Sequence, residues 1–345
     1  MNIIFMGTPE FAVESLRRLV ENHYNVVAVV TMPDKPVGRH HDTLQASPVK
    51  QYAVEQGIPV LQPERLKDER FLEELRSYHA DLQVVVAFRM LPEVVWAMPR
   101  LGTFNLHAAL LPQYRGAAPI NWAVINGEKQ TGVTTFFLDH EIDTGRVIHR
   151  EPVPIADTDT VGDVYDRLMQ VGADLVLRTV DDVEAGRVEA IPQEQLMREL
   201  GITSEADLRP APKIFKDTCR IQWNQHTVRS AYNFIRGLSP YPAAWTVLRT
   251  ADGRETPLKI YMSAPSSSEE NASSSSQEPL KPCQSRCVTP EGEPQVALLT
   301  DGRTYLRVAL SDGCLDLTDL QLAGKRRMPV ADFLRGARLE GASLI

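Results

Sequence analysis

A small set of amide, imidazole and carboxylate side chains is the part of this chain best suited to chemistry. Asn105 and His107 lie at the end of a run that predicts a strand, so both project to one face at its carboxyl end. At this spacing an amide and an imidazole can both address one ligand oxygen. Asp143 follows the next predicted strand, and its loop can return to His107. Together they suit oxyanion stabilisation and proton transfer, although most Asn-x-His pairs only make structural hydrogen bonds.

The first half of the chain alternates strand and helix patterns. Apolar, β-branched runs predict strands at 2–6, 26–31, 59–61, 82–87, 103–106 and 133–138. Periodic stretches predict helices at 10–21, 68–78 and 161–185. This alternation favours a Rossmann-like α/β domain with a mostly parallel sheet, which we expect over residues 1–190, followed by a linker at 191–206. The first turn contains a single glycine, Gly7, which disfavours a dinucleotide cofactor.

From residue 207 the pattern changes to short strands after a predicted helix at 227–238, which favours a C-terminal β-barrel (OB-like) domain over 207–345. A serine-rich segment at about 265–282 cannot bury enough apolar surface to order itself, so we expect a disordered insertion. Residues 207–345 carry 18 Lys and Arg against 15 Asp and Glu, whereas the remaining 206 residues carry 19 against 30. This asymmetry allows a polyanionic partner near the C-terminal part.

Composition excludes several classes of protein. The 345 residues are 43% hydrophobic and 24% charged, the balance of a globular protein with a sizeable core. The sequence has neither an apolar run long enough to cross a membrane nor a secretory signal, so we expect a cytoplasmic protein with no membrane partner. The four cysteines are too few for a disulfide framework and lack further ligands nearby, so we expect free thiols and no metal.

Longer strings in the sequence point to a known family. The chain resembles the folate-dependent formyltransferases over essentially its whole length. In the first domain the match rests on Asn105-Leu106-His107, Leu110-Leu111-Pro112, residues 115–120, and Asp139 with Asp143-Thr144-Gly145. The two-domain branch of the family is indicated by residues 33–36, Gly38-Arg39, and residues 47–50, 240–245 and 323–328. Two features depart from the family pattern: Ala109 replaces a usual serine, and segment 86–92 is shorter than usual.

The resemblance implies transfer of the formyl group of 10-formyltetrahydrofolate, a cosubstrate, to the α-amine of initiator methionyl-tRNA for translation initiation. It implies catalysis by Asn105, His107 and Asp143. The residues expected to contact folate are Phe88, Arg89, Leu91, His107, Leu110, Pro112, Asp139 and Asp143. The residues expected to contact tRNA are Lys35, Arg39, Lys213, Lys216, Lys325, Arg326 and Arg327. We expect the chain to act as a monomer.

Other interpretations stay open at this point. A formyltransferase acting on a small amine such as an amino sugar would use the same three residues without needing a basic surface. A non-catalytic tRNA-binding protein would not need Asn105, His107 and Asp143. The basic run Lys325-Arg326-Arg327 and the loop that carries Arg39 could each be a solvated surface feature.

Overall fold

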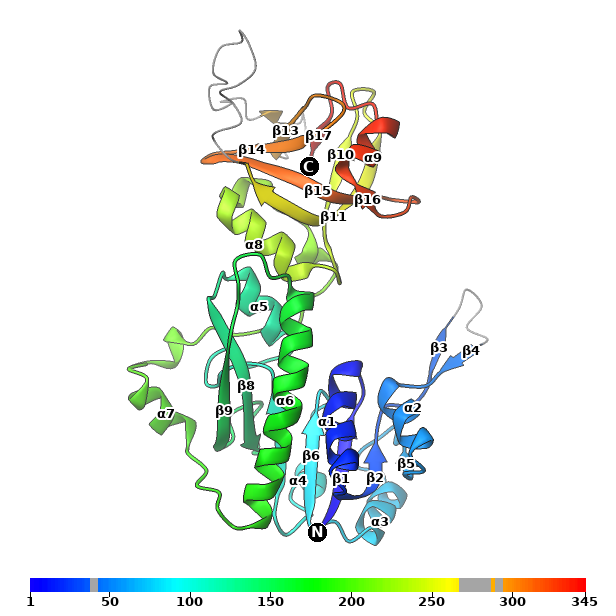
Figure 1. Ribbon diagram of the computed structural model, residues 1–345, viewed down its shortest axis with the longest axis vertical. Coiled ribbons are helices and arrows are strands. Elements are labelled where there is room, and N and C mark those ends of the chain that lie inside the picture. Colours follow the sequence, from blue (N-terminus) through cyan, green and yellow to red (C-terminus); the bar gives the residue numbers. More distant parts are fainter. Residues whose placement is uncertain (38–42, 267–286, 289–293) are drawn as a thin grey trace. The chain divides into compact units, whose positions relative to one another are not determined.

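A computed structural model describes residues 1–37, 43–266, 287–288 and 294–345 (Figure 1). Arg39 and residues 267–282 of the expected insertion lie outside these described residues. The chain divides into two compact units. The first unit is made of Met1–Pro119, Gln130–Pro154 and Val164–Pro212. The second is made of Ile120–Lys129, Ile155–Asp163 and Lys213–Ile345, so two short segments of the first half belong with the C-terminal part.

The first unit is built on a sheet with the strand order β5-β2-β1-β6-β7-β8-β9. Its strands are β1 (Asn2–Gly7), β2 (Asn25–Val30), β5 (Val60–Leu61), β6 (Leu82–Val86), β7 (Thr103–His107), β8 (Gln130–Phe137) and β9 (Val147–Pro154). The pairs from β5 to β7 are parallel, whereas β8 pairs antiparallel with β7 and with β9. The expected mostly parallel α/β sheet is therefore confirmed, with an antiparallel margin next to the strand that carries Asn105 and His107.

Helices cover both faces of this sheet. They are α1 (Glu10–Glu21), α2 (Pro48–Glu55), α3 (Glu69–Ser77), α4 (Glu93–Trp96), α7 (Gln193–Glu199) and the greater part of α6 (Val161–Glu184). On one face, residues of α3 and α4 such as Phe71 and Val95 pack on Ile4 and Met6 of β1. Helices α1 and α6 run side by side (Figure 1) and join through the edge-on contact of Phe11 with Tyr165. The central strands are buried on both faces, as in other doubly wound sheets.

A short hairpin of β3 (Lys35–Val37) and β4 (Thr43–Gln45) extends from the segment after β2. The charged and hydroxyl side chains that flank it bond to one another. Lys50 Nζ lies 2.7 Å from Asp34 Oδ2, which lowers the pKa of that carboxyl, and Thr31 Oγ1 lies 2.8 Å from Ser47 Oγ. Ser47 also caps α2 by accepting from the amide of Lys50 at 3.1 Å. These family-typical residues therefore shape the base of the hairpin.

The second unit contains an antiparallel barrel. Its strands are β10 (Ala244–Arg249), β11 (Glu255–Pro265), β12 (Cys287–Val288), β13 (Pro294–Thr300), β14 (Leu306–Leu310), β15 (Gly313–Leu322), β16 (Met328–Pro329) and β17 (Ser343–Leu344). The order β11-β10-β17-β13-β14-β15 is closed by pairing of β15 with β11. This closure confirms the expected C-terminal barrel.

Three helices belong wholly or mostly to the second unit: α5 (Pro119–Ile125), α8 (Val228–Leu238) and α9 (Val330–Gly336). Helix α8 begins where the sequence predicts it, because Thr227 caps its first turn through the amide of Ser230. Ile235 and Leu238 of α8 are fully buried against the barrel strands. No helix within the described part of the chain is long and apolar enough to cross a membrane.

Candidate active site

The carboxyl end of β7 holds the two residues that the sequence singles out. Asn105 is half-buried, and its side chain makes no hydrogen bond with any described residue. The imidazole of His107 is 6% exposed, and its Nε2 lies 2.8 Å from the carbonyl oxygen of Tyr114. Since a carbonyl only accepts, Nε2 must carry the hydrogen and donate it. This contact leaves Nδ1 of His107 as the ring atom available to a partner or a substrate.

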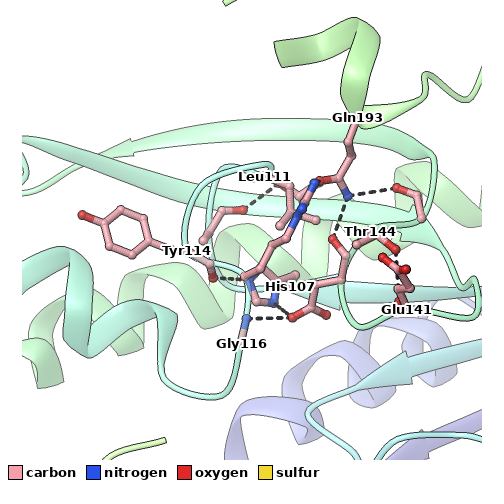
Figure 2. Close-up of polar contacts among 12 residues, drawn as sticks. His107, Leu111, Tyr114, Gly116, Glu141, Thr144 and Gln193 are labelled. Atoms are coloured by element: carbon pink, nitrogen blue, oxygen red, sulfur yellow. Dashed lines mark hydrogen bonds and ion pairs between the residues drawn. The ribbon is translucent and has the colours of Figure 1, made fainter. Parts of the chain in front are cut away.

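Asp143 supplies the group that faces Nδ1. Its Oδ2 lies 3.8 Å from Nδ1 of His107, close enough for an ion pair when the ring is protonated but too long for a hydrogen bond. The same oxygen accepts from the amide of Gly116 at 2.9 Å. The Asp143 side chain is 13% exposed, so its charge is only partly screened by solvent. Figure 2 shows His107 between the turn that carries Tyr114 and Gly116 and the turn that carries Glu141 and Thr144.

The backbone of both turns is unusual. Tyr114 has φ +59° and Asp143 has φ +57°, a left-handed conformation that side chains other than glycine seldom adopt. Such residues often mark functional sites, where surrounding contacts hold them in place. The first turn is fixed at Leu111, whose amide donates to Thr134 Oγ1 at 3.1 Å, and Thr134 Oγ1 in turn donates to the carbonyl of Ala109 at 2.6 Å. The turns thus form a built scaffold around His107.

The arrangement can stabilise negative charge and move a proton. Asn105 and His107 present their side chains on one face of β7, as the spacing predicts, and Asp143 reaches His107 across 36 positions of sequence. An imidazolium with a carboxylate beside it is a strong hydrogen-bond donor, and the carboxylate is a proton acceptor. The structure brings His107 and Asp143 together; their roles in catalysis, with that of Asn105, stay a prediction.

The residues expected to contact folate occupy three environments. Leu91 is buried in the core under β6, and Phe88 packs at the edge of that core. The Arg89 guanidinium donates to the carbonyls of Glu64, at 2.9 Å, and Pro63, and burial lowers the pKa of Arg89. Arg89 therefore ties segment 86–92 to residues 63–64. Leu110 and Pro112 lie between His107 and Tyr114, while Asp139 is exposed and accepts from the amide of His140 at 2.7 Å.

The residues expected to contact tRNA differ in how far their charge is free. Lys35, on β3, and Lys325 and Arg326, in the turn before β16, are exposed. Lys213 lies over the ring of Phe215 and Lys216 over that of Trp245, at 5.4 and 5.8 Å.

Arg327 differs from its two basic neighbours. It donates to Asp319 Oδ2 from Nε at 2.8 Å and from Nη2 at 2.6 Å, and it stacks on Tyr261 at 4.2 Å. The carboxylate raises the pKa of Arg327 and compensates its charge. Lys325 and Arg326 are therefore the better phosphate ligands of this run.

Sequence reasoning missed one residue that contacts the site. Gln193, the first residue of α7, donates from Nε2 to the carbonyl oxygens of Asp143 and Gly145 at 2.7 and 3.0 Å. Its Oε1 accepts from Arg115, which precedes Gly116. A glutamine 50 positions after Asp143 gives no signal in a single sequence. Among the described residues no group of His, Cys, Asp and Glu is arranged to hold a metal.

The comparisons with known proteins agree with this geometry. The family model "Formyl transferase" matches residues 1–180, and "Formyl transferase, C-terminal domain" matches residues 213–338. A methionyl-tRNA formyltransferase of Parabacteroides distasonis is 60% identical over 336 residues, which cover 97% of this chain and 95% of that protein.

Two solved structures share the fold. HypX from Aquifex aeolicus in complex with tetrahydrofolic acid superposes with a TM-score of 0.58 at 19% identity, over 98% of this chain and 47% of the HypX chain, so this chain spans about half of that protein. WlaRD, a sugar 3N-formyl transferase, superposes with a TM-score of 0.60 at 16% identity, over 94% of this chain and 99% of its own. With two family models that together cover most of its residues and a relative of 60% identity along nearly its full length, the chain belongs to the formyl transferase family.

Proposed function

We propose that this chain is an enzyme that transfers the formyl group of 10-formyltetrahydrofolate to the α-amine of methionine on initiator methionyl-tRNA. The observation that carries the chemistry is the approach of His107 Nδ1 to Asp143 Oδ2 at 3.8 Å beside the free amide of Asn105. The choice of acceptor is supported by the 60% identity to a methionyl-tRNA formyltransferase over 95% of its length. The cosubstrate supplies a reactive formyl carbon; the residues of the chain do the rest.

Asn105 and His107 would stabilise the negative charge that develops on the formyl oxygen when the amine attacks. Asn105 donates from its side-chain amide. His107 has to donate from Nδ1, because its Nε2 hydrogen is held by the carbonyl of Tyr114. Nδ1 carries a hydrogen at the same time as Nε2 only in the imidazolium form, which the neighbouring Asp143 carboxylate favours. One such donor contributes about 3 to 4 kcal/mol of transition-state stabilisation.

Asp143 would carry the proton. The attacking amine loses one proton, and N10 of the leaving folate gains one, so a single carboxylate can accept the first and return it to the second. The amide of Gly116 holds Oδ2 at 2.9 Å, which leaves Oδ1 of Asp143 for this exchange. The reaction needs no covalent enzyme intermediate, since both steps proceed at the formyl carbon.

The two parts of the chain divide the work in this proposal. Residues 1–190 form the catalytic domain, residues 191–206 the linker and residues 207–345 the tRNA-binding domain. Folate contacts Phe88, Leu91, Leu110, Pro112 and Asp139 together with the catalytic residues, and Arg89 supports that wall. The exposed cations at positions 35, 213, 216, 325 and 326, together with Arg39, contact tRNA phosphates. We infer that the chain acts as a monomer in the cytoplasm, where charged tRNA is used.

Transfer to charged tRNA can be tested directly. The protein is incubated with 10-formyltetrahydrofolate and initiator methionyl-tRNA, the ester bond is hydrolysed, and formyl-methionine is measured by mass spectrometry. A nucleotide-linked amino sugar and free methionine serve as competing acceptors, and the Asp143→Asn variant serves as the inactive control. Formyl-methionine from tRNA alone supports the proposal. Preferred formylation of the amino sugar, or equal product from wild type and Asp143→Asn, would overturn it.

A further inference from the structure

The side chain of Gln193 joins the two turns that form the site. It is 1% exposed, and its Nε2 donates to the carbonyl oxygens of Asp143 and Gly145. Its Oε1 accepts from Arg115 Nε at 3.1 Å and from Arg115 Nη2 at 2.7 Å. All four hydrogen-bonding positions of the amide are therefore used (Figure 2).

The turn that Gln193 holds is one that needs holding. Asp143 has φ +57°, and a residue with a side chain keeps that conformation only where its surroundings impose it. At Gly145, an added Cβ would lie 1.7 Å from the carbonyl oxygen of Phe137, so the end of the turn sits directly against the sheet. Between these two points the carbonyl groups of Asp143 and Gly145 face the Gln193 amide, which fixes the direction in which the Asp143 carboxylate leaves the backbone.

Gln193 is itself firmly anchored. Val147 and Ile191 exchange backbone hydrogen bonds of 2.8 Å in both directions, which places α7 beside the end of β9. Leu196, on the next turn of α7, packs in a cluster with Leu111 and Phe136. The carbonyl of Arg115 also accepts from the amide of Ala211 at 2.8 Å. Gln193 therefore connects two turns from a segment that is fixed to both.

We propose that Gln193 is a positioning residue for formyl transfer, which acts by orienting Asp143 toward His107. It touches neither substrate nor the reacting atoms in this proposal, and its effect passes through the backbone of the Asp143 turn and through Arg115 to the Gly116 amide that binds Oδ2. The inference rests on the proposed function, because it assigns Gln193 a role in that reaction.

Replacing Gln193 by methionine keeps the length of the side chain and removes all four hydrogen bonds. We expect kcat for formylation of methionyl-tRNA to fall by roughly 10- to 100-fold, as for a misplaced catalytic group, with both KM values within about twofold of wild type. Gln195→Met is the matched control, since Gln195 lies on the same helix, is exposed and bonds only to Glu199. It should leave kcat unchanged. A Gln193→Met enzyme with the kcat of the Gln195→Met control would overturn the inference.

A double-mutant cycle separates positioning from general loosening of the structure. If Gln193 acts through Asp143, then Gln193→Met should cost nothing further once Asp143→Asn is present, measured in single-turnover reactions. A full, multiplicative loss in the double variant would show that Gln193 acts elsewhere and would also overturn the inference. If the wild-type chain itself fails to formylate methionyl-tRNA, the proposed function fails first, so the two failures are distinguishable.

Two further variants keep the test open if Gln193→Met does not fold. Gln193→Glu preserves the acceptor for Arg115 but has no N–H to donate, so kcat should fall as it does for methionine. Arg115→Lys leaves Gln193 in place and removes the paired contact with Oε1; a smaller loss of kcat, absent in the Asp143→Asn background, is expected. Wild-type kcat in Gln193→Glu would show that the bonds to the Asp143 turn do not matter.

Discussion

Gly116 offers the sharpest test of how backbone geometry supports this site. Its φ is +126°, which favours glycine, and a Cβ added there would lie 2.4 Å from the carbonyl oxygen of Ala211 and 2.9 Å from its carbonyl carbon. Backbone strain of this kind costs about 1–3 kcal/mol. Forcing a methyl group against fixed atoms costs about 1–3 kcal/mol more. Gly116→Ala should therefore destabilise the first unit by about 2–6 kcal/mol, which lowers Tm by roughly 5 to 20 °C.

The same substitution should impair formyl transfer even where the protein stays folded. The Gly116 amide donates to Asp143 Oδ2, so a turn pushed away from Ala211 would move that donor and the carboxylate with it. We expect kcat to fall by roughly 10-fold or more at a temperature well below the new Tm. Thermal unfolding and single-turnover formylation of methionyl-tRNA measure the two effects.

Gly186→Ala is the matched control for this experiment. Gly186 also has a positive φ, +66°, but no atom lies within 4 Å of an added Cβ, so only the backbone strain of about 1 kcal/mol remains. Its kcat should equal that of wild type. If Gly116→Ala behaved like Gly186→Ala in both Tm and kcat, the tight contact with Ala211 and the role of the Gly116 amide would both be refuted.

Three other predictions follow from the same structure. His107→Ala should lower kcat by about 100-fold or more without weakening tRNA binding, and near-normal turnover in a formylation assay would remove His107 from the mechanism. Replacing Lys325 and Arg326 by Ala should raise KM for methionyl-tRNA and reduce its salt dependence, each by up to about one phosphate contact, whereas Arg327→Ala should change the slope less; equal slopes in all variants would contradict this. Ion pairs to Lys129 and Arg229 lower the pKa of Asp157 to about 2 in the folded protein, so they stabilise it above the ordinary carboxyl pKa and are lost as pH falls toward 2. Asp157→Asn should therefore lower Tm at pH 7 slightly and leave Tm unchanged near pH 2, and an equal loss of Tm at both pH values would contradict the assignment.

The elements that the sequence predicted well are those with strong local signals. The helix over Glu10–Glu21 has the predicted bounds, because its apolar residues repeat at helical spacing, and α8 starts next to its capping residue Thr227. The approach of Asp143 to His107 was also predictable, since both follow strands that end near the same edge. The antiparallel pairing of β8 with β7 was not, because strand direction depends on partners that are distant in sequence.

The parts of the site that could not be predicted depend on contacts across long separations. Gln193 meets the Asp143 turn only because α7 is docked beside β9, and neither feature has a local signature. The pairing of Arg327 with Asp319 is set by the register of β15 and β16, so the sequence showed three equal cations where the structure distinguishes one. Arg39 lies outside the described residues and stays a prediction.

The pairing of Ile191 with β9 has a consequence for how the chain is made. Strand β9 forms the margin of the first sheet, and such margins invite other chains to add a strand. Pro152 and Pro154 lack the backbone N–H that an incoming strand would need, and Ile191 occupies the N–H and C=O of Val147. A ribosome-bound or truncated chain that stops at residue 190 lacks Ile191 and exposes this margin of the sheet. Such a chain should aggregate more readily than one that extends through α7.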